Sequence, residues 1–489
     1  MGIIQRQGIK NTIVTYAGIL IGFLNLIVLQ PLFLTPEEIG LTRVLFSFSS
    51  LISVFLPLGV GHIIVRYFPG FRNEEKRHHG FFGFVLLFPL AGMLAVALFL
   101  FLFRDFFIAQ YEKESRMFAD YFNYVIPLSF FLGLVTVLNI YAFALYKTTI
   151  PSILNDVVIR IFSMVVISVY FLKWITLSQF IFLFVAVYAV QMIALLVYIF
   201  MVDRPGFRID FTRLKSQNLP GMFSYGFLLS FASVASLGLK YLDTIMIGHY
   251  LPLSYVGIYT IAAFIPTVIE APLNSLEKIA NTKTAAALAS GNRDEIKEIY
   301  YKSSRYLLLA GGLLFAGINV NIDSLLAFLP ESYSMGSGVV LIISIGTLFN
   351  MAAGSNTSII FNSEHYKFGA FLLIFLVVIA FVLNMIFIPL WNLEGAAVAT
   401  ALSGLVYSLM KYFFIWKKHH LQPYDGKTLR IVLLTVLCFL LKYMIPLTGF
   451  PLADILIRST LVLLLYLSGT YFMKIVPEFH QYLPRHNRE

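Results

Sequence analysis

Two short stretches of the chain have the same pattern, Leu34-Thr-Pro-Glu-Glu-Ile-Gly40 and Leu251-Pro-Leu-Ser-Tyr-Val-Gly257. Each is a turn between two apolar runs, and the second begins 217 positions after the first. A later pair of similar stretches, 146–151 and 362–367, has an offset of 216. Because the offset stays nearly constant over this distance, the sequence predicts a duplicated unit with both copies in the same orientation.

The composition indicates a polytopic membrane protein. The chain has 489 residues, of which 59% are hydrophobic and only 12% are charged, and its mean hydropathy is +0.84. A soluble protein of this length needs far more charged surface. The single cysteine, Cys438, excludes an intrachain disulfide. No Cys or His cluster has zinc spacing and no glycine-rich phosphate loop occurs, so we predict no metal, no cofactor and no nucleotide-driven motor.

Fourteen apolar runs reach the length of about 20 residues that crosses a bilayer as a helix. They lie at 12–33, 41–65, 80–103, 120–145, 152–173, 178–201, 221–247, 254–276, 304–326, 336–361, 367–390, 394–416, 429–447 and 452–474. Together with the repeat, they predict an all-α integral membrane protein. We expect two parallel six-helix lobes with pseudo-two-fold symmetry, residues 1–203 and 204–418, followed by two further helices and a tail, residues 419–489.

The distribution of basic residues predicts the orientation. Only eight of the 35 Lys and Arg residues fall in the odd-numbered connections, whereas 27 lie near the termini or the even-numbered connections. Cytoplasmic segments carry such an excess of Lys and Arg, so both termini are expected in the cytoplasm. The same distribution explains the net charge of +10, and nucleic acid is not a predicted partner.

Two charged residues in the seventh run share one helix face, because Lys240 and Asp243 are three positions apart. One interpretation is a pair that neutralises itself, or a lysine that extends to the outer interface. The other is a functional site, because charges inside a bilayer are costly and are usually kept for function.

The acid in the eighth run, Glu270, stands between Pro266 and Pro272. Prolines free backbone carbonyls inside a membrane helix, as in the binding sites of transporters. Either Lys278 holds Glu270 near the inner interface, or Glu270 lines a cavity and carries a coupling proton. The first copy lacks these charges, since the matching positions are Phe23, Leu26 and Ser53 for Lys240, Asp243 and Glu270 respectively.

The first copy has cations of its own at Arg43, Arg66 and Arg160. Guanidinium groups bind phosphate oxygens in a bidentate fork, so these residues would suit an anionic substrate such as a diphosphate. The alternative for the cations at the inner ends of helices is topology alone. Arg43 lies near the outer end of its run, where that alternative is weaker.

No catalytic set of residues is evident. The outer loops are short, and the acids of the segment 104–119 read as an ordinary solvated loop rather than a paired-carboxylate site. His78-His79 and His419-His420 read as solvated loop residues rather than metal ligands. A membrane glycosyltransferase, polymerase or ligase is therefore disfavoured, and we predict that the chain is not an enzyme.

Several motifs taken in order resemble the multidrug/oligosaccharidyl-lipid/polysaccharide (MOP) exporter superfamily, above all its polysaccharide or O-antigen-type flippases. They are Leu34-Thr-Pro-Glu-Glu-Ile-Gly40, Gly59 to Arg66-Tyr-Phe-Pro69, Leu242-Asp243 to Gly248 before Val256-Gly257-Ile-Tyr259, and Leu393-Glu394-Gly395-Ala-Ala-Val-Ala399. The first apolar run has no acid, unlike many drug exporters of the superfamily, and no arginine-rich start, unlike lipid II flippases. A drug exporter and a lipid II flippase are therefore weaker alternatives, although both stay open.

The resemblance implies a transporter of polysaccharide biosynthesis in the bacterial inner membrane. It would flip an undecaprenyl-diphosphate-linked oligosaccharide, such as a lipopolysaccharide precursor, from the cytoplasmic to the outer leaflet by alternating access. Arg43, Arg66, Arg160 and Lys240 are the candidate substrate-binding cations, and Asp243 and Glu270 are the candidate coupling residues. The implied partners are the lipid-linked oligosaccharide, membrane lipids, a coupling proton or sodium ion, and a polysaccharide polymerase.

Overall fold

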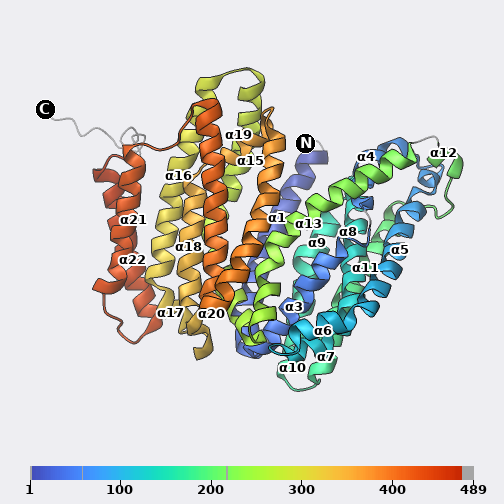
Figure 1. Cartoon of the computed structure of the whole chain (residues 1–489), viewed down its shortest axis with the longest axis horizontal. Helices are drawn as coiled ribbons and strands as arrows, with labels where there is room; N and C mark the ends of the chain where they lie inside the picture. Colours follow the sequence, from blue (N-terminus) through green and yellow to red (C-terminus); the bar gives the residue numbers. More distant parts are fainter. Residues whose placement is uncertain (1–2, 58, 216–217, 476–489) are drawn as a thin grey trace. The chain divides into compact units, whose positions relative to one another are not determined.

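The computed structural model describes residues 3–57, 59–215 and 218–475, and in these ranges the regular structure is entirely helical. The chain divides into two compact units, with the division between Gly257 and Ile258. Figure 1 shows the helices with the labels used below. The predicted lobe boundaries at 203 and 418 stay a prediction.

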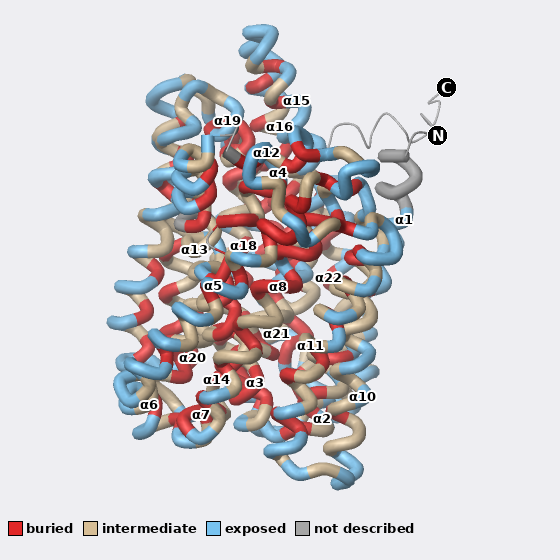
Figure 2. The backbone as a smooth tube through the Cα atoms, turned by 90° about the vertical axis from the view of Figure 1, so that its right-hand side faces the viewer, coloured by how far each residue is buried: buried red, intermediate tan, exposed pale blue. Residues whose placement is uncertain are grey.

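The first unit consists of long helices joined by short helical segments. Its elements are α1 (Ile3–Phe23), the π-helix η1 (Leu24–Leu29), α2 (Gln30–Phe33), α3 (Pro36–Ser53), α4 (Val60–Phe71), η2 (Arg77–Gly80), α5 (Phe81–Leu102), α6 (Arg104–Tyr111), α7 (Arg116–Tyr121), η3 (Phe122–Tyr124), α8 (Val125–Ala144), α9 (Thr149–Ile153), the π-helix η4 (Leu154–Val158), α10 (Ile159–Phe171), α11 (Leu177–Val202), α12 (Phe211–Lys215) and α13 (Leu219–Tyr250). Helix α8 is mostly buried, whereas α10 is mostly not, so α8 lies at the centre of this unit (Figure 2).

The second unit likewise consists of long helices and short helical segments. After α14 (Leu253–Phe264), which crosses the division, come α15 (Thr267–Ala289), α16 (Arg293–Val320), α17 (Ile322–Leu326), η5 (Glu331–Gly336), α18 (Ser337–Ala352), α19 (Asn356–Asn362), α20 (Tyr366–His419), α21 (Gly426–Met444) and α22 (Pro451–Phe472). The long helix α20 has non-helical backbone at Trp391 and Asn392, which separates two of the predicted runs.

Ten of the described helices are long and apolar enough to cross a membrane, or eleven if α14 and α15 form one bent span. The chain is therefore a multi-pass membrane protein, as its composition predicts. The predicted number of fourteen is not confirmed, because the runs 41–65 and 429–447 lie on helices outside this set and α20, which holds two runs, counts as one helix. In the first of them, four buried serines of α3 and a break after Ser53 interrupt the apolar run.

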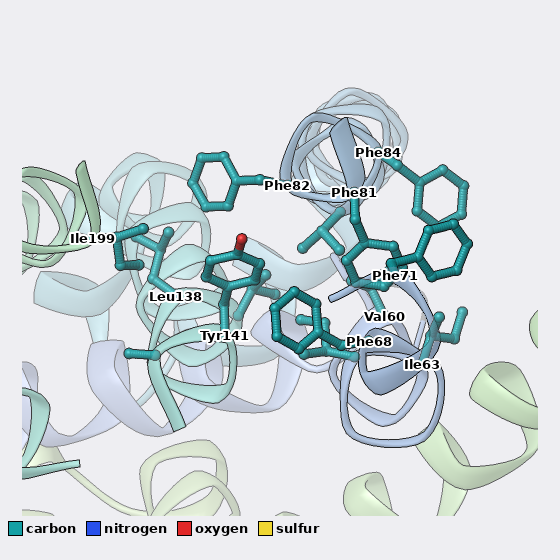
Figure 3. Packing of buried hydrophobic residues seen from close by; sticks show 14 of the residues in the cluster. Val60, Ile63, Phe68, Phe71, Phe81, Phe82, Phe84, Leu138, Tyr141 and Ile199 are labelled. Carbon is teal, nitrogen blue, oxygen red and sulfur yellow. The ribbon is translucent and has the colours of Figure 1, made fainter. Parts of the chain in front are cut away.

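A cluster of aromatic and aliphatic residues forms the core of the first unit around α4, α5, α8 and α11. Figure 3 shows Phe68, Phe81, Phe82 and Ile199 around the ring of Tyr141. Between membrane helices, side chains this large stabilise the packing by van der Waals contact rather than by removal from water. This core fixes one end of α4, α5, α8 and α11, of which only α4 carries a predicted site residue, Arg66.

Candidate substrate-binding site

The two repeated turns have the same local structure. Leu34 and Leu251 are both extended, with φ/ψ of −121°/150° and −134°/158°, and each donates its N–H to the carbonyl four residues before it. Helices α3 and α14 begin two residues later in both turns. The sequence predicted this correspondence, and the backbone geometry agrees with it.

The two turns also pack against each other through their glycines. A Cβ atom on Gly40 would lie 1.9 Å from the carbonyl oxygen of Leu253, and one on Gly257 would lie 2.0 Å from the carbonyl oxygen of Pro36. These contacts are reciprocal, as expected for two copies related by a two-fold axis. Only glycine permits such a close approach of two backbones.

Arg43 lies on α3, two turns after its start, and is surrounded by other elements of the first unit. Its Nη2 donates to Oε1 of Gln30 at 2.9 Å, and its Nε is buried without a hydrogen-bond partner. Tyr188 of α11 and Tyr241 of α13 lie close enough to interact with its charge. In the described part of the chain no carboxylate lies within 4 Å of the guanidinium, so Arg43 is a half-buried cation whose Nε is buried and has no partner.

Aromatic rings connect Arg43 with a second cation. Phe46, one helical turn after Arg43, has its ring 5.6 Å from that of Tyr188 and 5.9 Å from that of Tyr241. The ammonium of Lys240 lies 5.2 Å from the centre of the Tyr241 ring. The structure therefore brings two of the four predicted cations, Arg43 and Lys240, to the same tyrosine, while Asp243 is half-buried one turn further along α13.

The other two predicted cations have different surroundings. Arg66 is exposed on α4, with its guanidinium 4.4 Å from the centre of the Tyr225 ring. The Nη1 of Arg160 donates to the carbonyl of Gly18 on α1, and Gly22 leaves the space that the same guanidinium fills. Arg160 thus joins α10 to α1. The substrate-binding role of both residues stays a prediction.

In the second unit, the predicted break around Glu270 is present. Helices α14 and α15 are bent by 48° at Ile265 and Pro266, and Pro272 lies inside α15. Glu270 is half-buried, and Glu277 lies two turns later, close enough to interact with it. Among the described residues Glu270 has no ion-pair partner, so the interpretation in which Lys278 holds it receives no support from the contacts.

Sequence reasoning missed a buried lysine in the same unit. Lys411 of α20 is 2% exposed, its Nζ donates to Oγ1 of Thr357 at 3.0 Å, and it lies 4.1 Å from the centre of the Tyr407 ring. It lies five positions before the end of the predicted run 394–416. A lysine inside an apolar run rather than after it is a signal that could have identified it.

The interpretation of His78 and His79 as solvated loop residues is wrong. His78 is 1% exposed, and its Nε2 lies 2.6 Å from Oδ1 of Asp203, which also accepts from the Tyr141 hydroxyl at 2.9 Å. His79 lies 3.1 Å from Asp210. The backbone N–H of Arg213 and the His79 ring hold the pKa of Asp210 below its usual range. These partners are more than 120 residues away in sequence, so no local pattern predicts them.

Comparison with known proteins identifies the family. Residues 5–278, more than half of the chain, match the family described as polysaccharide biosynthesis protein. The chain belongs to this family. An uncharacterised membrane protein of Methanocaldococcus jannaschii is 22% identical over 472 residues, which cover 90% of this chain and 89% of that protein.

Solved structures of the MOP superfamily share the fold of this polysaccharide biosynthesis protein. The lipid II flippase MurJ in an inward closed conformation has a TM-score of 0.74 at 16% identity, covering 95% of this chain and 99% of MurJ. An inward-facing multidrug resistance transporter of the MATE family has a TM-score of 0.63 at 13% identity, covering 82% of this chain and 94% of that one. The predicted fold of the MOP superfamily is confirmed by these structures, and the family match is to polysaccharide biosynthesis proteins.

Metal binding has no evident site in this family member. Among the residues that the structure describes, no group of three or more His, Cys, Asp or Glu side chains could hold a metal ion.

Proposed function

We propose that this protein flips an undecaprenyl-diphosphate-linked oligosaccharide from the cytoplasmic to the outer leaflet of a bacterial inner membrane. The observation that carries the proposal is Arg43, a half-buried residue whose buried Nε has no hydrogen-bond partner and whose guanidinium has no carboxylate within 4 Å among the described residues. An isolated buried cation is costly to a fold, and its cost is offset when an anion binds. A diphosphate supplies that anion, and a guanidinium binds it in two places at once.

The surroundings of Arg43 support a substrate that joins a charged group to a sugar. Tyr188, Tyr241 and Phe46 present aromatic rings beside the guanidinium, and Lys240 adds a second positive charge. A drug exporter for cationic compounds needs acids at this place instead. Membership of the polysaccharide biosynthesis family agrees with the same conclusion.

Transport is proposed to proceed by alternating access, with both termini in the cytoplasm, and to be driven by a proton or sodium ion. Asp243 and Glu270 are the proposed coupling residues, because both are half-buried acids in helices of the apolar region. A polysaccharide polymerase is the proposed consumer of the flipped product.

Deletion of the gene in its native host tests this function. We expect loss of the surface polysaccharide on a carbohydrate-stained gel and accumulation of its lipid-linked repeat unit in the membrane extract, both reversed by the wild-type gene. Unchanged polysaccharide together with new sensitivity to cationic dyes would contradict the proposal and favour drug export.

A further inference from the structure

A groove of about 670 Å³ runs along α11 and ends at an arginine. Its walls are Ile193, Leu196, Val197, Phe200 and Met201, and its mouth is formed by Arg204. The wall residues recur at intervals of three and four, so they occupy one face of the helix. None of them belongs to the group of residues around Arg43.

The groove faces the bilayer rather than the interior of the protein. Ile193 is 53% exposed and Met201 is 74% exposed, although both are large apolar side chains in a membrane-spanning helix. Surface of this kind is covered by lipid chains in a membrane. The groove is therefore accessible to an acyl chain from the side.

The arginine at the mouth is directed to the groove by its backbone. Arg204 follows the end of α11 and has a φ of 46°. This value lies in the left-handed region of the backbone, which residues other than glycine rarely adopt. Such a conformation costs on the order of 1 kcal/mol and is maintained by its surroundings. It allows the side chain to line the same groove as Phe200 and Met201, the last turn of the helix.

The neighbouring acids do not neutralise this arginine. The Asp203 carboxylate accepts hydrogen bonds from His78 and Tyr141, and Asp210 is paired with His79. Among the described residues, no carboxylate lies within 4 Å of Arg204. Both acids thus have a histidine partner, whereas Arg204 and Arg208 are exposed.

An aromatic residue extends the apolar wall to the surface. Phe207 is 59% exposed, and its ring stacks on Phe200 at 5.6 Å. Gly83 permits this arrangement, because a Cβ atom there would lie 2.4 Å from the carbonyl oxygen of Phe207. Exposed aromatic rings beside arginines are typical of the headgroup region of a bilayer.

We propose that this groove binds one anionic phospholipid of the cytoplasmic leaflet, with an acyl chain along α11 and the phosphate on Arg204. Charge complementarity favours an anionic headgroup, and the open side of the groove favours a lipid of the surrounding leaflet over the transported substrate. Basic pockets at the cytoplasmic ends of membrane helices bind such headgroups. This inference concerns a resident lipid and holds whichever substrate is transported.

Native mass spectrometry of the full-length protein, released from detergent, tests the proposal directly. The probes are dioleoyl phosphatidylglycerol, dioleoyl phosphatidylcholine and undecaprenyl diphosphate. We expect Arg204→Gln to weaken the tightest phosphatidylglycerol binding about fivefold, as for the loss of one basic contact, and to leave phosphatidylcholine binding unchanged. Lys147→Gln, which removes an exposed lysine that does not line the groove, should bind phosphatidylglycerol as the wild type does.

A second variant tests the apolar part of the groove. Val197→Trp should fill the groove and remove one bound phosphatidylglycerol, whereas Val165→Trp on the exposed side of α10 should not. Phosphatidylglycerol binding that is unchanged in both Arg204→Gln and Val197→Trp would overturn the proposal. Tighter, Arg204-dependent binding of undecaprenyl diphosphate would also overturn it, because the occupant would then be the carrier lipid.

Discussion

The turns at 34–40 and 251–257 are nearly identical in backbone, yet the helices that follow them differ in chemistry. Helix α3 has Arg43 after its turn, and the matching position on α14 is Thr260. The reverse holds for Glu270, whose counterpart is Ser53. The duplicated scaffold therefore does not require these charges, because each copy folds without those of the other. Charges present in one copy only are the first place to look for function.

The largest expected effect is a loss of stability on substitution of the turn glycines, which both copies share. Gly40→Ala and Gly257→Ala should each lower the free energy of unfolding by about 3 kcal/mol, because each Cβ meets a backbone carbonyl that has no room to move. Thermal unfolding of the purified protein measures this. Gly404→Ala is the control, since a Cβ there meets nothing within 4 Å. A large loss from only one of the two substitutions would show that the turns are not equivalent.

A smaller effect is expected at an acid found only in the second copy. Glu270→Gln should reduce surface polysaccharide several-fold while the amount of protein in the membrane stays normal, because Glu270 has no ion-pair partner among the described residues and is the proposed coupling acid. The reciprocal variant Ser53→Ala should retain export. Full export by Glu270→Gln would remove Glu270 from the coupling site.

The smallest effect concerns a cap that only the first turn has. Thr35 accepts a hydrogen bond from the Glu38 N–H, and Glu38 accepts one from the Thr35 N–H, whereas the matching residue in the second turn is Pro252. Thr35→Ala should cost about 1 kcal/mol of stability. Urea or thermal unfolding would detect it, and no change would mean that packing alone determines the start of α3.

Local signals in the sequence were sufficient for much of the fold. The turns and the bend at Pro266 each depend on residues a few positions apart. Hydrophobic runs located the helices for the same reason. The break in α3 was missed, because a run of mixed serine and apolar residues still reads as one span.

The site was predicted less completely, because its contacts are distant in sequence. Arg43 and Lys240 were both identified by charge and depth, but only the structure shows that Tyr241 brings them together. Arg160 was predicted as a substrate-binding cation on the basis of its residue type, but its guanidinium donates a hydrogen bond to the carbonyl of Gly18. Lys411 and the pair of His78 with Asp203 could not be found from neighbouring residues, since their partners lie 54 and 125 positions away.

Complementation of the deletion strain with Arg43 variants is the most direct test of the account. Arg43→Gln should reduce surface polysaccharide about tenfold or more and raise the lipid-linked repeat unit, because a charged hydrogen bond to the substrate is lost. Arg43→Lys should retain part of the activity, and Arg72→Gln, an exposed arginine beside Tyr146, should retain all of it. Full export by Arg43→Gln, at normal protein level in the membrane, would contradict the claim that Arg43, a cation present in only one of the two copies, binds the substrate.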